Sequence, residues 1–103
     1  MVDAAADTMA LVERLVAASD GVSPLGAGIL AALALDIASD SRTFARVFGI
    51  AHALVLRELT MLGVEGGYIA ITRRDPRTQR THYELSTAGL QLLGTAGGDT
   101  TTS

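Results

Sequence analysis

The chain contains no cysteine and few aromatic residues. The missing cysteine excludes disulfides, cysteine-ligated zinc and thiol nucleophiles. Aromatic residues make up 4% of the chain, whereas hydrophobic residues make up 49%. A core of Ala, Leu, Val and Ile favours packed helices over a large sheet. We therefore expect a mainly α protein of the α+β class.

No long apolar run is present either. The most apolar stretch, residues 25 to 35, is shorter than the roughly 20 residues that a membrane span needs. The first four residues lack the basic and then apolar order of a signal peptide. From these two absences we expect a soluble protein located in the cytoplasm.

The positive charge is unevenly distributed. There is no lysine, all eight basic residues are arginines, and the formal net charge is −3. That balance does not favour nucleic-acid binding over the whole surface, because affinity for phosphate comes from clustered cations. Four arginines nevertheless fall in one short segment, Arg73, Arg74, Arg77 and Arg80, whose only acid is Asp75. This segment is locally strongly positive.

Helical patterns fill the first two thirds of the chain. Apolar residues recur at helical spacing over 4 to 18, and the pair Ser23-Pro24 is typical of the start of a second helix. The second helix is apolar nearly all round to about residue 38, which predicts that it is buried. The polar residues 39 to 41 then supply a new N-cap.

Two further helices follow, separated by a tight turn. A short third helix is predicted over 43 to 48, and Gly49 ends it. A fourth helix is predicted over 51 to 62, where three apolar residues recur at core spacing, and the glycine-rich residues 63 to 67 end it.

The spacing of the apolar residues changes after this helix. Residues 68 to 72 and 81 to 85 are rich in β-branched and aromatic side chains, so each segment predicts a strand. Between them, residues 73 to 80 contain the turn signal Asp75-Pro76. We predict a β-hairpin with a basic tip.

The end of the chain predicts a last short helix and a tail. The helix covers residues 87 to about 93, with Ser86 or Thr87 as its cap. We expect one domain over 1 to 94 and a disordered tail over 95 to 103, because the tail is rich in Gly and Thr without apolar anchors.

This order of elements has a physical logic. A helix fits the major groove of B-form DNA, a second helix braces it across the backbone, and a hairpin with arginines at its tip reaches flanking phosphates or the minor groove. The order therefore favours docking on duplex DNA.

Residues 39 to 93 resemble MarR-type winged helix-turn-helix regulators. The segment 44 to 50 (FARVFGI), the helix after it and Gly67-Tyr68-Ile69 are similar to that family's helix-turn-helix and first wing strand. The segment 73 to 80 (RRDPRTQR), followed by 83 to 89 (YELSTAG), is similar to its wing, with Leu-Ser in place of the usual Leu-Thr. The chain is a short variant, because the family usually carries longer terminal helices.

The resemblance implies a winged helix-turn-helix fold and a DNA-binding transcriptional regulator. In that hypothesis helix 51 to 62 enters the major groove and the hairpin 73 to 80 contacts the backbone or the minor groove. The resemblance also implies a homodimer, which we expect to form through the N-terminal helix. The expected partner is duplex DNA, with no membrane and no cofactor.

Seven side chains are candidate DNA contacts. They are Arg42, His52, Arg57, Arg73, Arg74, Arg77 and Arg80. Asp75 is interpreted as a structural residue that orders the neighbouring arginine side chains. Arg57 and His52 are equally explained as exposed helix residues, and Arg46 on the third helix either touches the backbone or covers core surface with its alkyl stem.

A second hypothesis uses the same helix differently. Leu54, Leu56 and Met61 predict an apolar exposed surface, which is more typical of a protein partner than of a phosphate-lined groove. This alternative is a winged-helix protein-interaction module. Catalysis is not expected, because His52 and His82 lack paired metal spacing and the chain has no glycine-rich phosphate loop.

Overall fold

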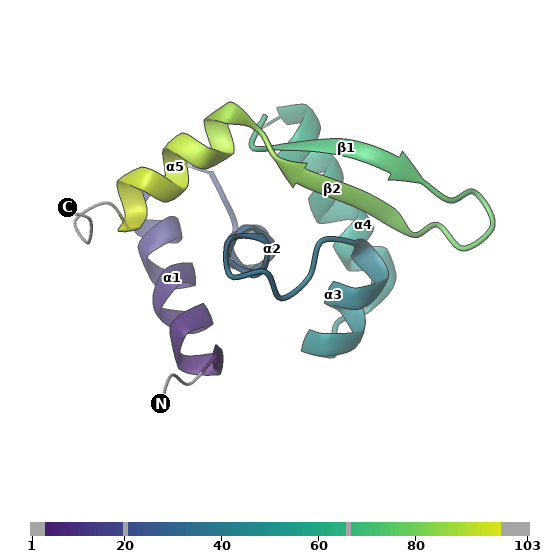
Figure 1. Ribbon diagram of the computed structural model, residues 1–103, viewed down its shortest axis with the longest axis horizontal. Helices are drawn as coiled ribbons and strands as arrows, with labels where there is room; N and C mark the ends of the chain where they lie inside the picture. The colour runs from purple at the N-terminus through teal and green to yellow at the C-terminus, as the bar shows by residue number, and fades with distance from the viewer. Residues whose placement is uncertain (1–3, 20, 66, 98–103) are drawn as a thin grey trace.

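The computed structural model describes residues 4–19, 21–65 and 67–97 (Figure 1). This part of the chain is mainly helical, with one two-stranded antiparallel sheet, as expected from composition. The helix α2 lies at the centre, seen end-on in Figure 1, between α1 and α5 on one side and α3 and α4 on the other. The β-hairpin extends away from the body at the end opposite both termini.

The first two helices form much of the core. Helix α1 spans Ala4–Ala18, as predicted, and α2 spans Pro24–Ala34. The side chain of Ser23 caps α2 by accepting a hydrogen bond of 2.9 Å from the Gly26 N–H. Helix α2 ends four residues before the predicted position, because Asp36 takes a left-handed conformation with φ of 58°. Aspartate tolerates this region better than most residues, and the apolar pattern that continues beyond it concealed the end of the helix.

Helix α3 spans Ser41–Phe48 and begins earlier than predicted. Asp40 is its N-cap, and the carboxylate accepts from the Thr43 N–H at 3.0 Å and from the Thr43 hydroxyl at 2.7 Å. Gly49 ends the helix with φ of 65°, a conformation that costs glycine little. The predicted tight turn after Phe48 is therefore confirmed.

Helix α4 is shorter than the predicted helix 51 to 62. It spans His52–Thr60 and continues into a π-helical turn, η1, over Met61–Glu65. The Tyr68 N–H donates to the Leu62 carbonyl at 2.9 Å, which turns the chain from η1 toward the sheet. A π-turn cannot be recognised from apolar spacing, because its core contacts resemble those of an α-helix over so few residues.

The sheet consists of β1, Ile69–Arg74, and β2, Thr81–Leu85. Ile69 pairs with Leu85 and Ile71 with Tyr83, but the register shifts between Ile71 and Arg73. This bulge carries β1 further into the basic segment than predicted, so two of the arginines expected in the tip belong to the strand.

Helix α5 spans Thr87–Gly97 and ends later than the predicted position at about residue 93. Residues 95 to 97 continue the helix, and the rest of the expected tail, 98 to 103, lies outside the described residues. Ser86 caps α5 by accepting from the Gly89 N–H at 3.1 Å, and its own N–H donates to the Tyr68 carbonyl at 3.0 Å. A Cβ on Gly89 would lie 2.1 Å from the Tyr68 carbonyl oxygen, so only glycine fits where α5 crosses the chain before β1.

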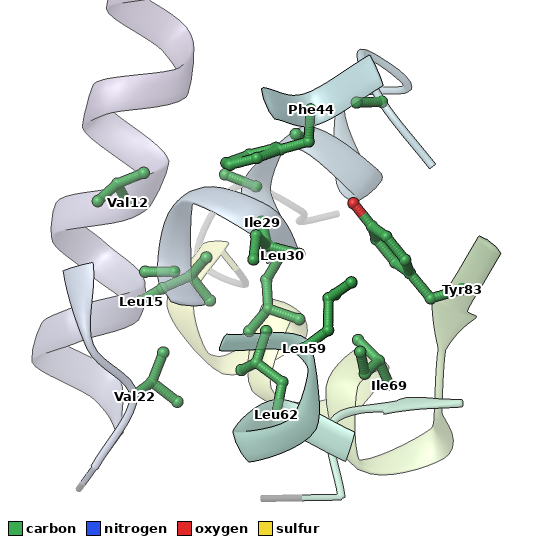
Figure 2. Packing of buried hydrophobic residues seen from close by; sticks show 14 of the residues in the cluster. Val12, Leu15, Val22, Ile29, Leu30, Phe44, Leu59, Leu62, Ile69 and Tyr83 are labelled. Atoms are coloured by element: carbon green, nitrogen blue, oxygen red, sulfur yellow. The ribbon is translucent and has the colours of Figure 1, made fainter. Parts of the chain in front are cut away.

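The core is built around α2, as its apolar sequence predicted (Figure 2). Ile29, Leu30, Ala31 and Ala32 are fully buried. The other helices and both strands each contribute side chains to the same cluster, among them Leu15, Phe44, Val55, Leu59, Ile69, Tyr83 and Leu92. Among the described helices, none is both long and apolar enough to cross a bilayer.

Candidate functional site

The hydroxyl of Ser41 joins three elements at one point. Ser41 is the first residue of α3 and is fully buried. Its Oγ accepts from the Thr81 N–H at the start of β2, at 3.0 Å, and lies 2.8 Å from Nε2 of His52, the first residue of α4. Helices α3 and α4 and the hairpin therefore share a common anchor. Sequence reasoning did not single out this serine.

Asp40 connects the same region to the hairpin by charge. Arg80 Nη1 donates to Asp40 Oδ2 at 3.0 Å, and Asp40 forms a single antiparallel bridge with His82 in β2. Burial alone would raise the pKa of Asp40, but hydrogen bonds from Thr43 and the charge of Arg80 together lower it below its ordinary value. Asp40 is therefore ionised at neutral pH and holds Arg80 at the base of the hairpin.

Arg42 holds the tip of the hairpin. Its Nε and Nη2 both donate to the carbonyl oxygen of Thr78, at 3.1 and 2.6 Å. Arg42 and Arg80, which the sequence suggested as DNA contacts, thus have partners within the chain and fix the hairpin relative to α3. Their pairing with residues more than thirty positions away leaves no signal in local sequence.

Asp75 organises the turn through the backbone. Its Oδ1 accepts from the Arg77 N–H at 2.9 Å, while its own N–H donates to the Arg80 carbonyl at 2.9 Å. The hydrogen bond from Arg77 is the main reason that the pKa of Asp75 is lowered, and the Arg73 charge adds to the effect. Asp75 was expected to order arginine side chains. In the structure its carboxylate accepts from the peptide N–H of Arg77, as in an Asx turn.

The remaining hairpin arginines are presented to solvent. Arg73, Arg74 and Arg77 are exposed, and within the described part of the chain their side chains form no hydrogen bond or ion pair. The bulge places Arg74 opposite the buried Thr81 and Arg73 opposite His82. Since directly opposed residues share a face of the sheet, Arg74 points to the α4 side and Arg73 to the other side.

Helix α4 presents a mixed surface. Arg57 is exposed and, in the described residues, unpaired, whereas His52 is half-buried against Ser41. Burial lowers the pKa of His52, and the charges of Arg42 and Arg80 lower it further. His52 is therefore mainly neutral at pH 7.

The predicted apolar surface of this helix is only partly present. Leu54 and Met61 are 50% and 42% exposed, respectively. Leu56, predicted to be exposed, is half-buried and packs against the core, because it lies three residues before the buried Leu59 and so beside it on the helix surface.

Two hollows flank these elements. One, of about 430 Å³, lies between α3, the following turn and the hairpin, and is lined by Arg42, Ala45, Arg46, Ile50, His52 and Arg80. The other, of about 300 Å³, lies between the end of α4 and β1, and is lined by Leu59, Thr60, Gly63, Ile69, Ala70, Ile71 and Arg74. Arginine side chains thus border both sides of the α4–hairpin region.

Acidic and metal-ligating groups are not gathered in this way. No three His, Asp or Glu side chains among the described residues are close enough to hold a metal ion.

Comparisons with protein-family models, with curated proteins and with solved structures find no match to the chain.

Proposed function

We propose that the protein is a winged helix-turn-helix regulator of the MarR type that acts in the cytoplasm by binding duplex DNA without catalysis. In this proposal α3 and α4 form the helix-turn-helix and the β1–β2 hairpin is the wing. The observation that carries the proposal is the exposure of Arg73, Arg74 and Arg77 on a hairpin that is itself fastened to α3.

The attachment of the hairpin to the body matters because a rigid binding surface loses less conformational entropy on binding. Arg42, Arg80 and Ser41 hold the hairpin through contacts to Thr78, Asp40 and Thr81. A hairpin held in this way loses little conformational entropy when it meets a ligand. Three exposed guanidinium groups on such a support suit the phosphates of a nucleic-acid backbone.

Helix α4 is the element that we assign to the major groove. Its exposed residues include Arg57 and Thr60. Arg57 supplies a donor for a phosphate or for the O6 and N7 atoms of guanine. Few other polar groups are on this surface, so we expect phosphate contacts to supply most of the affinity.

A twofold dimer completes the proposal. Met9 and Val16 lie seven residues apart on one face of α1, with 57% and 36% exposure. Leu90 of α5, which packs beside α1, is 59% exposed. These helices lie at the end of the molecule opposite the hairpin (Figure 1), so a dimer formed there leaves both hairpins open. Sedimentation of wild type and a Met9→Glu variant tests it, with a dimer expected only for the wild type.

Charge variants in the hairpin test DNA binding directly. The double change Arg74→Ala with Arg77→Ala is expected to weaken binding to all duplex sequences alike and to reduce the slope of log affinity against log salt by about two. Arg14→Ala removes the same type of charge from the exposed surface of α1 and serves as the matched single-charge control. Equal affinity for the double variant and the wild type would show that the hairpin is not the wing of this proposal.

Exposure of Leu54 and Met61 favours one second candidate, a winged-helix module that binds a protein partner. Leu54→Ser separates the two functions, because the module predicts loss of a protein complex with DNA binding intact. The regulator predicts that DNA affinity changes and that no complex depends on Leu54.

A further inference from the structure

The 430 Å³ hollow beside α3 is bordered by three arginines. Hydrogen bonds within the chain use only some of their N–H donors. Arg42 and Arg46 are one helical turn apart on α3, and Arg80 approaches from the hairpin. The only carboxylate that pairs with these arginines in the described residues is Asp40, which holds Arg80. Like charges at i and i+4 destabilise a helix, so the pair Arg42 and Arg46 carries a cost that a bound anion would offset.

The guanidinium groups are also held ready to donate. Arg42 binds Thr78 through Nε and Nη2, which leaves Nη1 pointing away from that carbonyl, and Arg80 binds Asp40 through Nη1 alone. Each group therefore keeps N–H donors while one edge is fixed. Arg46 is exposed, and in the described chain it has no hydrogen bond or ion pair. A fixed pair with one unpaired arginine is an arrangement suited to several oxygens of one anion.

We propose that this hollow, lined by Arg42, Arg46, Arg80 and His52, binds one phosphate group. Two sources share that chemistry, a phosphodiester of the DNA backbone and a free phosphorylated small molecule. The DNA source rests on the proposed function, since α3 and the hairpin would then meet the backbone beside the groove that α4 enters. Arg46 is the contact that this proposal adds to the exposed hairpin arginines, because Arg46 lines the hollow and Arg73, Arg74 and Arg77 do not.

His52 provides an independent readout of occupancy. The groups around it are Arg42 on α3, Arg80 at the base of the hairpin, and Asp40, with Ser41 at hydrogen-bond distance. Two of the three charges are positive and disfavour the imidazolium. A phosphate in the hollow adds negative charge and raises the pKa of His52, so a phosphodiester, whose own charge does not change near neutral pH, binds more strongly as the pH falls.

The first arm of the test uses inorganic phosphate with the full chain. NMR signals of the arginine side chains and of His52 are followed as phosphate is added at constant ionic strength, for wild type, Arg46→Gln and Arg14→Gln. The expected result is a saturable shift with a raised His52 pKa in the wild type and Arg14→Gln. Arg46→Gln is expected to bind about fivefold more weakly or worse.

The second arm uses a short mixed-sequence duplex with the same three proteins. If the hollow takes the DNA backbone, Arg46→Gln lowers affinity and reduces the salt slope by about one, while Arg14→Gln matches the wild type. Saturable phosphate binding without duplex binding supports the free-phosphate source and removes the proposed function. Duplex binding without any Arg46 effect in either arm overturns this inference and leaves the proposed function intact.

Discussion

Arg42 on α3 donates two hydrogen bonds to the carbonyl oxygen of Thr78 in the hairpin turn, at 3.1 and 2.6 Å. A hairpin of two short strands is marginally stable in water by itself, and the tip of this one extends beyond the body of the molecule (Figure 1). The contact from Arg42, together with that from Arg80 to Asp40, makes the hairpin part of the same rigid surface as α3.

Replacing Arg42 with Ala tests this fastening. We expect loss of about 1 kcal/mol of stability or less, since the hydrogen bonds are charge-assisted but exposed to solvent. Amide hydrogen exchange should accelerate in the turn 75–80 and remain slow in α2. Arg57→Ala, which removes an exposed arginine without a described partner, should leave exchange in the turn unchanged. Equal protection of the turn in both variants would contradict the fastening role.

Ser41 gives a second prediction about the same region. Ser41→Ala leaves the buried N–H of Thr81 without its acceptor and releases His52, so we expect a loss of about 1–3 kcal/mol in urea denaturation. Ser39→Ala is the matched control, because the Ser39 contact to β2 uses only its carbonyl oxygen and its side chain is exposed. A Ser41→Ala protein as stable as Ser39→Ala would show that the shared anchor contributes little.

Two glycines of α5 predict opposite responses to the same change. Gly89→Ala forces a Cβ against the Tyr68 carbonyl and should destabilise by roughly 1–3 kcal/mol. Gly94→Ala meets nothing within 4 Å, so the better helix propensity of Ala should stabilise by about 0.5–1 kcal/mol. Thermal unfolding measures both. Equal shifts in the same direction would contradict the close approach at Gly89.

Much of the fold follows from local sequence patterns. The close approach at Gly89 shows that such patterns do not predict contacts between distant segments. Capping at Ser23, the turn at Gly49 and the paired strands all depend on neighbouring residues, so the pattern predicted them. The left-handed Asp36 and the π-turn after α4 interrupt the helices while the apolar spacing continues. They could not be predicted in the same way.

The candidate site, too, could be predicted only in part from local sequence. Arg73, Arg74 and Arg77 were identified from the clustering of arginines in one short segment, because such a cluster can be seen without tertiary information. Arg42 and Arg80 were given the same role, and their partners, Thr78 and Asp40, became visible only when the hairpin was placed against α3. The contribution of Arg46 to a hollow likewise depends on packing.

Acid should weaken the fold through Asp40. The pKa of Asp40 is lowered from the ordinary 3.8 in the folded chain. As the pH falls, the unfolded state therefore binds a proton at this carboxylate more readily than the folded state does. The stabilisation is complete above the unfolded pKa and is lost as the pH falls through the folded pKa. We expect the urea midpoints of wild type and Asp40→Asn to differ at pH 7 and to converge as the pH falls below 3.8 and through the lower pKa of the folded chain. A difference that stays constant with pH would contradict the ionised pairing.

The central claim is contact between the exposed hairpin arginines and DNA phosphates, and salt dependence tests it most directly. The measurement is fluorescence anisotropy of wild-type protein with a labelled mixed-sequence duplex, titrated from low to near-physiological salt. We expect binding whose log affinity falls linearly and steeply with log salt, because counterions leave the DNA as arginines replace them. Absence of binding at the lowest salt would contradict it and would favour the protein-interaction function at Leu54 and Met61.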